Sequence, residues 1–141
     1  MNVKKVLRIV LGIGLAVLLL IQLVPIDRTH PPTTSEPKWS SAEARALAKE
    51  HCFQCHSNET QWPWYSYIAP ASWLIRWDVI NAREAFNFSE WDKNPGDLQL
   101  MVRMIQRGKM PPIQYTLFHP KAVMNDEQKK ALIDALTASL Q

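Results

Sequence analysis

The 141-residue sequence predicts an all-α protein, in which an apolar N-terminal helix precedes a small helical domain. Three observations favour this class. The first 25 residues hold one long apolar run, later stretches carry helix-start signals with apolar residues at helical spacing, and no stretch alternates as a β-strand does. After this run about 100 residues remain, close to the usual size of a single domain.

The N-terminal run is the first element. Residues 9–24 are apolar except for Gln22, and the run is only slightly shorter than the roughly 20 residues that span a bilayer. It has no polar face, unlike a helix of a soluble core. A cleaved signal peptide is the alternative, but no small-x-small pattern precedes Pro25. We expect an uncleaved signal anchor at residues 1–25, a proline-rich tether at 26–39 and one domain at 40–141.

Charge sets the expected orientation of this anchor. Lys4, Lys5 and Arg8 account for the whole net charge of +3, because acidic and basic residues balance in the rest of the chain. No basic face is left for nucleic acid, so nucleic-acid binding is excluded. Basic residues beside a membrane segment stay in the cytoplasm. The sequence therefore predicts a single-pass protein of the bacterial inner membrane, with its domain in the periplasm.

Four helices are expected in the domain. They span Ser40–Glu50, Ser72–Ala85, Asp97–Arg107 and Asn125–Leu140. The first and last begin with apparent capping boxes, in which a short polar side chain precedes Glu or Gln by three residues. Gly108 stops the third helix. In the second helix, we expect Trp73, Ile80 and Trp77 to face inward.

The motif that carries chemistry follows the first of these helices directly. Cys52, Cys55 and His56 form the pattern C-x-x-C-H, which is typical of covalent attachment of a c-type haem. Two thiols one helical turn apart match the two vinyl groups of haem, with which they form thioethers. The adjacent histidine reaches the iron as an axial ligand. We therefore expect one haem c, held by Cys52 and Cys55, with His56 on the iron.

Other uses of two cysteines are weighed against this interpretation. A disulfide is possible because these are the only two cysteines of a chain expected outside the cytoplasm. A thioredoxin-like redox pair needs a preceding strand, and the sequence predicts none. A zinc site needs a second pair of ligands, for which only His51 and His119 are available. The haem interpretation is favoured over all three.

A second iron ligand is expected from Met110. It stands before Pro111 and Pro112, which restrict the backbone, and a thioether is a soft ligand suited to haem iron. His119, in Phe-His-Pro, is the main competitor, and an open site is the third possibility. The other methionines of the domain are interpreted as core residues.

Several stretches in order resemble the haem-binding domain family of bacterial cytochrome c-like proteins. They are CFQCHS at 52–57, WPWY at 62–65, IAP at 68–70, FNFSEW at 86–91, MPP at 110–112 and HP at 119–120. The resemblance covers roughly residues 40–140 and implies a class I cytochrome c-like fold with long loops around one haem. As in cytochromes c, a carbonyl from a proline-containing loop, at Pro63 or Pro70, is expected to accept the free ring N–H of His56. Trp62, Trp64, Tyr65 and Arg83 are candidates for haem propionate contacts or for plain packing.

The expected function is electron transfer among periplasmic or respiratory redox proteins, with the membrane segment keeping the haem near them. No nucleophile–base pattern or nucleotide loop is present, so we expect no independent enzymatic activity. A haem-based redox or gas sensor, with an open or displaceable sixth ligand, is the alternative. A peroxidase-like enzyme, which also needs an open iron, is the third. The sequence does not indicate an oligomeric state.

Overall fold

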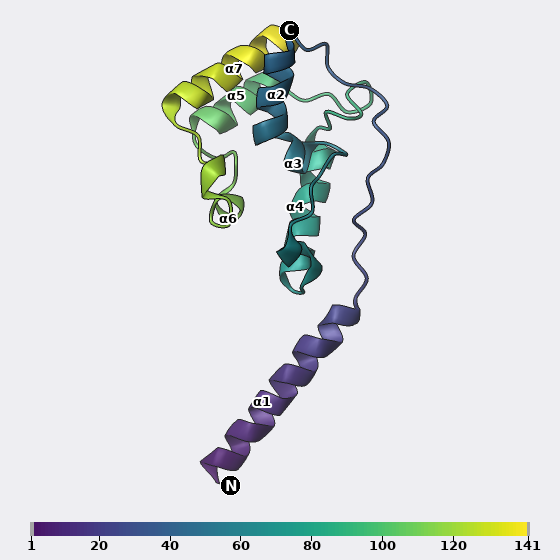
Figure 1. Ribbon diagram of the computed structural model, residues 1–141, viewed down its shortest axis with the longest axis vertical. Coiled ribbons are helices and arrows are strands. Elements are labelled where there is room, and N and C mark those ends of the chain that lie inside the picture. The colour runs from purple at the N-terminus through teal and green to yellow at the C-terminus, as the bar shows by residue number, and fades with distance from the viewer. Residues whose placement is uncertain (1, 141) are drawn as a thin grey trace. The chain divides into compact units, whose positions relative to one another are not determined.

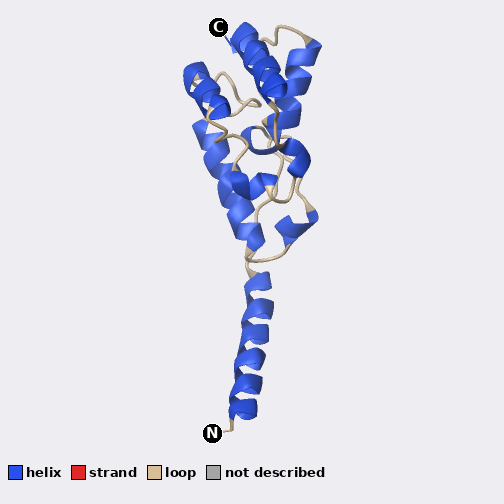
Figure 2. Cartoon of the chain, turned by 90° about the vertical axis from the view of Figure 1, so that its left-hand side faces the viewer, coloured by secondary structure: helices blue, strands red, loops and turns tan. Residues whose placement is uncertain are grey.

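A computed structural model describes residues 2–140, and all regular elements within this range are helical (Figures 1 and 2). Met1 and Gln141, the end residues of two predicted segments, lie outside the described residues. The α-helices are α1 (Val3–Leu20), α2 (Ala42–His51), α3 (Phe53–His56), α4 (Ala71–Ala85), α5 (Leu98–Gln106), α6 (Ile113–Thr116) and α7 (Asp126–Leu140). Three 3-10 turns are η1 (Ile21–Leu23), η2 (Trp64–Tyr67) and η3 (Pro120–Ala122). The predicted all-α class is confirmed.

The chain forms two compact units. The first contains the residues up to 29 together with 62–78, and the second contains 30–61 and the residues from 79 onward. The helix α4 belongs to the first unit through Asp78 and to the second from Val79.

In the first unit, α1 and η1 form the apolar helix expected from the sequence. Val3–Leu23 is long and apolar enough to cross a membrane, and neither α1 nor η1 has a buried residue. At 1.5 Å per residue it extends about 30 Å, the thickness of a bilayer's hydrocarbon core. Asn2 caps its start, where the side-chain oxygen accepts a hydrogen bond from the Lys4 N–H at 3.1 Å.

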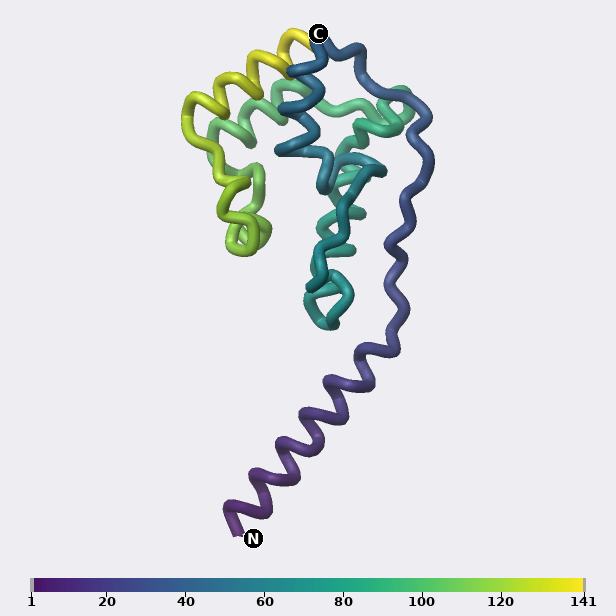
Figure 3. Tube along the Cα trace, in the orientation of Figure 1, coloured from purple at the N-terminus to yellow at the C-terminus, as the bar shows by residue number. Residues whose placement is uncertain are grey.

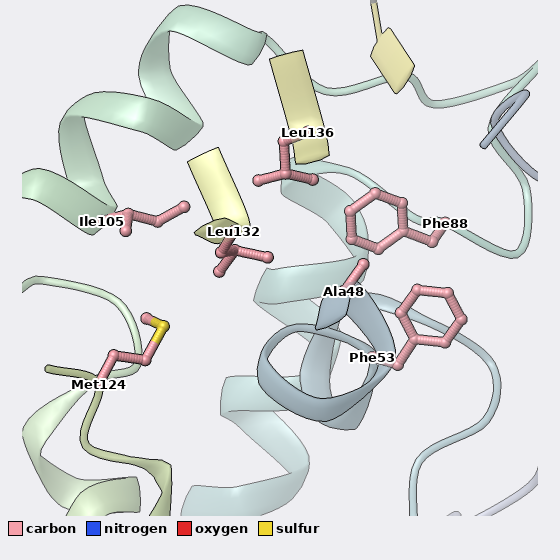
Figure 4. Packing of buried hydrophobic residues seen from close by; sticks show 7 residues of the cluster. All are labelled: Ala48, Phe53, Phe88, Ile105, Met124, Leu132 and Leu136. Carbon is pink, nitrogen blue, oxygen red and sulfur yellow. The ribbon is translucent and has the colours of Figure 1, made fainter. Parts of the chain in front are cut away.

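The core of the second unit lies where α2, α5 and α7 meet (Figure 4). Leu132 and Leu136, one turn apart on α7, are each only 1% exposed, as expected for the apolar stripe of an amphipathic helix. Their neighbours in the cluster are Ala48, Phe53, Phe88, Ile105 and Met124. The end of α7 returns to the start of α2 (Figure 3), where the backbone N–H of Ser40 donates to the Ser139 hydroxyl at 3.1 Å.

The helix ends follow the predicted signals, with one shift. In α7 the capping box is complete, because Asn125 and Gln128 each accept from the other's backbone N–H, at 2.8 and 2.9 Å. Asp97 caps α5 and Gly108, with φ +63°, ends it in the left-handed conformation. The predicted cap of α2 at Ser40 is wrong by one residue: the Ser41 hydroxyl accepts from the Ala44 N–H instead.

The predicted inward face of α4 is also wrong. Trp77 is 62% exposed and Trp73 is 36% exposed, whereas Ile80 is half-buried. The buried positions are Ser72 and Val79, two turns apart and each next in sequence to a residue that was expected inside. Burial therefore follows the small residues of this helix, and the large rings lie beside that stripe.

Residues 30–39, most of the predicted tether, are extended, and they belong to the second unit, where they contact its other residues. The Thr34 N–H donates to the Ser89 carbonyl at 2.9 Å, and Ser35 forms an isolated parallel bridge with Glu90. Farther on, both oxygens of Glu36 accept from the guanidinium of Arg45 on α2, at 2.6 and 2.7 Å. Such bidentate pairs fix geometry as well as adding energy.

Candidate functional site

The two cysteines lie on one turn at the junction of α2 and α3. Cys52 is the C-cap of α2, where its N–H donates to the Ala48 carbonyl at 2.8 Å, and it is also the N-cap of α3. Its own carbonyl accepts from the N–H groups of Cys55 and His56, at 3.2 and 2.9 Å. This turn places the thiols three residues apart on a helix, hence on one face of it. Neither thiol is part of a disulfide.

The state of these thiols bears on the rival interpretations. Burial raises the pKa of Cys52 to about 12, and the neighbouring Cys55 adds to the rise. A raised pKa keeps this thiol protonated at neutral pH, whereas the attacking thiol of a redox pair has a lowered pKa. Among residues 2–140 no group of three or more His, Cys, Asp or Glu side chains is placed to hold a metal ion. The zinc interpretation therefore gains no support.

The surroundings of His56 favour its neutral form, which is the form that binds a metal. It is 9% exposed and its ring stacks on that of Phe86, with centroids 3.9 Å apart. Burial lowers its pKa, and the carbonyls of Phe86 and Ala82 oppose this only in part. Its Nδ1 lies 3.4 Å from the Phe86 carbonyl, a long hydrogen bond that leaves Nε2 as the nitrogen for a metal. The carbonyl was expected near Pro63 or Pro70, but the structure supplies it from Phe86.

A short segment, Phe86–Glu90, holds the chain at His56 and just after it. Besides the Phe86 contact, the N–H of Phe88 donates to the His56 carbonyl at 2.9 Å, and the Ser89 hydroxyl accepts from the Asn58 N–H at 3.0 Å. Asn87 donates to the side-chain oxygen of Asn58 at 3.0 Å. These polar residues are at most 6% exposed. Inside a protein such a satisfied network fixes one conformation, here that of the motif histidine.

Arg83 forms hydrogen bonds to the loop that follows the motif, at residues 57–60. Its guanidinium donates to the Ser57 carbonyl at 2.8 Å and to the Thr60 hydroxyl at 3.0 Å. Ser57 and Thr60 are almost fully buried, at 0% and 1% exposure. The structure thus gives Arg83 a role in positioning the chain after the motif. Its predicted alternative, a contact with haem propionates, stays a prediction.

The two candidates for a sixth ligand lie on the connection from α5 to η3. Met110 is half-buried beside the cis peptide to Pro111, and its N–H donates to the Met104 carbonyl at 3.3 Å. The His119 ring stacks on Tyr115 at 4.2 Å, with its Nδ1 3.2 Å from the Tyr115 carbonyl. These contacts hold the backbone of Met110 and the ring of His119 to their own segment. The structure thus brings Cys52, Cys55 and His56 together, while the ligand role of Met110 stays a prediction.

The donor set and one orphaned atom fit a haem beside this turn. Two thiols on one face of a turn and a neutral imidazole are the groups that c-type attachment uses. In addition, Nδ1 of His51, directly before Cys52, is buried and has no hydrogen-bond partner among residues 2–140. An unpaired buried nitrogen is costly, which fits a site whose polar partner is not part of the polypeptide.

Sequence reasoning found the motif and marked residues 86–91 through the family resemblance, but it missed that the Phe86–Glu90 segment contacts His56. Its backbone groups make two of the contacts to His56, and a backbone donor or acceptor leaves no mark in residue type. The one usable signal was the pair Asn87 and Ser89 between aromatic residues, since short polar side chains in that setting need buried partners.

Comparison with known proteins supports haem binding. A family model described as "Haem-binding domain" matches residues 16–138. The chain is also similar to "Cytochrome c peroxidase Ccp" of Escherichia coli (strain K12), with 25% identity over 95 residues. This match covers 62% of the chain but only 20% of that protein, so the chain spans about a fifth of its relative's length. No solved structure matches significantly. Because the family model covers most of the sequence, the chain belongs to the haem-binding domain family.

Proposed function

We propose that this protein is a membrane-anchored cytochrome with one covalent haem c, which passes single electrons between periplasmic partners. The observation that carries the proposal is the α3 turn, in which two thiols outside any disulfide precede a neutral, buried histidine whose Nδ1 faces the Phe86 carbonyl. Membership of a haem-binding family supports it. The haem would supply the one-electron iron couple on which such transfer depends.

The chain's own residues then have distinct tasks. Cys52 and Cys55 would bind the haem edge, and His56 would bind the iron through Nε2 while the Phe86 carbonyl orients its ring. Met110 would be the second side chain to bind the iron, and methionine ligation raises the reduction potential. The ring of Phe88 lies 5.2 Å, between centroids, from the ring of Phe53 and also from that of Phe86. These three rings would keep water from the side of the haem that His56 occupies.

The apolar helix supports the membrane part of the proposal. Val3–Leu23 has the length and composition to span a bilayer, and the basic residues before Ile9 would remain on the cytoplasmic side. The domain would then face the periplasm. Tethering to the membrane raises the effective concentration of the haem near respiratory-chain partners. The chain would have no enzymatic activity of its own.

One observation favours a second candidate. The similarity to a protein called a cytochrome c peroxidase makes peroxide reduction at an open iron the competing function. The two candidates differ at Met110, because a methionine on the iron closes the position that peroxide would occupy.

The test uses the full-length protein, produced with the c-type maturation machinery and purified in detergent. We expect the wild type to show a low-spin ferric spectrum with the weak long-wavelength band of methionine ligation, and to turn over no peroxide. Met110→Ala should lose the band, and Met104→Leu, a nearby methionine of α5, should keep it. A high-spin wild type that reduces peroxide would instead support the peroxidase candidate. A low-spin spectrum indifferent to Met110→Ala would move the ligand to His119.

A further inference from the structure

The first unit exposes a short aromatic surface on and just after η2. Trp64 is 75% exposed, Tyr67 is 61% exposed and Ile68, the next residue, is 48% exposed. We call these three residues the aromatic tip. Single exposed apolar residues are normal in proteins, but three within five positions form a patch that indicates an interaction.

The aromatic tip is fixed to the end of the apolar helix. Gln22, the one polar residue in the run at 9–24, pairs with the backbone of Ala69 in both directions. Its amide nitrogen donates to the Ala69 carbonyl at 3.2 Å, and its amide oxygen accepts from the Ala69 N–H at 2.9 Å. Ala69 directly follows Ile68, so the tip lies at the level where the apolar helix ends.

Residues just beyond the helix add two further ties. The Arg28 guanidinium donates to the Ser66 carbonyl from Nε and Nη2, at 2.9 and 2.5 Å, and lies 4.4 Å from the ring centroid of Tyr67. Arg76 on α4 pairs with Asp27 at 3.3 Å. Two buried residues, Ser66 within η2 and Ala69 just after it, thus make the contacts that hold this segment, while the side chains of Trp64 and Tyr67 are exposed to solvent. An arginine beside exposed aromatic rings is the composition of a bilayer's headgroup zone.

We propose that the aromatic tip inserts into the headgroup region of the membrane that α1 crosses, next to the point where the helix leaves it. The inference rests on the membrane anchoring proposed above and extends it from the helix to a second, discontinuous segment. Trp and Tyr concentrate at this depth because one end of each ring system is apolar and the other forms hydrogen bonds. The first unit then rests on the lipid surface, instead of hanging from a free linker.

The continuity between the patch and α1 favours lipid over a protein partner as the occupant. Gln22 stands at the end of the hydrophobic stretch, where a polar side chain reaches the interface, and its bonds place Ile68 and Ala69 at the same depth. A surface held at that depth meets headgroups before it meets any soluble protein. Capture of the tip by a protein partner is the outcome that would contradict this.

Photo-crosslinking to lipid tests the proposal. The full-length, haem-loaded protein is placed in nanodiscs of phosphatidylethanolamine and phosphatidylglycerol that contain a phospholipid with a diazirine near the glycerol. After illumination, adducts are mapped by mass spectrometry. We expect adducts on α1 and on the peptide that carries the aromatic tip. Ile113, Leu117 and Phe118 are as exposed, at 75%, 72% and 68%, and serve as the internal control that should stay unlabelled.

The outcomes separate the two proposals. Adducts on α1 with none on the aromatic tip above the control residues would overturn this inference and leave the membrane anchor intact. An unlabelled α1 would overturn both. Replacement of the pairing amide, in Gln22→Ala, should lower labelling of the tip severalfold relative to α1, whereas Gln106→Ala, an exposed glutamine at the end of α5, should not. Equal tip labelling in both variants would contradict the fixing of the tip by Gln22.

Discussion

Removal of one hydroxyl from the segment that holds His56 should cost measurable stability. The Ser89 hydroxyl is the acceptor for the Asn58 N–H at 3.0 Å, and the two residues are 1% and 3% exposed. In Ser89→Ala this N–H would stay buried without a partner. A buried donor that loses its acceptor costs about 1–3 kcal/mol, so we expect a loss of about 2 kcal/mol in the free energy of unfolding.

Urea unfolding of the full-length protein in mild detergent, followed by circular dichroism, measures this loss. At a typical slope of roughly 2 kcal/mol per molar urea, the unfolding midpoint should fall by about 1 M at unchanged slope. The matched control is Thr33→Ala, at an exposed hydroxyl of the second unit, which should change stability by less than about 0.5 kcal/mol. If the two variants unfold at the same urea concentration, the buried network does not support the motif.

Two further predictions concern contacts outside the motif. Asn125→Ala removes the capping oxygen of α7 and should destabilise the protein by about 1 kcal/mol, measured by the same unfolding assay; no loss would show that the capping box does not contribute. Arg45, by its hydrogen bonds, lowers the pKa of Glu36, so the ion pair stabilises the fold above the ordinary glutamate pKa and is lost as pH falls through the lowered value. Glu36→Gln should therefore be less stable than the wild type at pH 7, and the gap should close in acid; a gap that persists in acid would refute the ionic origin.

Sequence signals predicted helices well wherever the signal is local. Asp97 and the pair Asn125 and Gln128 cap the helices they were expected to cap, because each cap acts within a few residues of itself. The predicted position of the α2 cap was wrong because of a contact with a residue distant in the sequence. Ser40 and Ser41 both suit a cap, but the N–H of Ser40 is engaged by Ser139 at the far end of the chain, and the cap falls to Ser41.

The prediction of the inward face of α4 was wrong for a similar reason. Trp73 and Trp77 fit an inward stripe by size and spacing, yet burial depends on which elements pack there, and Ser72 and Val79 occupy the buried positions. Large rings are therefore an uncertain guide to the packed side of a short helix.

In the candidate site, too, the local part was predictable from the sequence and the part distant along the chain was not. The motif at Cys52, Cys55 and His56 is contiguous, so its spacing alone predicted the turn that the structure shows. The group that faces His56 Nδ1 lies thirty residues farther along the chain and is a backbone carbonyl, which any residue type provides. No pattern in a single sequence marks such an acceptor, and reasoning from proline-containing loops pointed to other positions.

The central claim is covalent haem at the α3 turn, and the intact mass of the protein tests it most directly. The full-length chain, matured with the c-type assembly machinery, should exceed its polypeptide mass by one haem after denaturation in acid and organic solvent. Cys52→Ala combined with Cys55→Ala should have the polypeptide mass alone. A wild-type chain without the added mass, or a double variant that keeps it, would contradict attachment through these two cysteines.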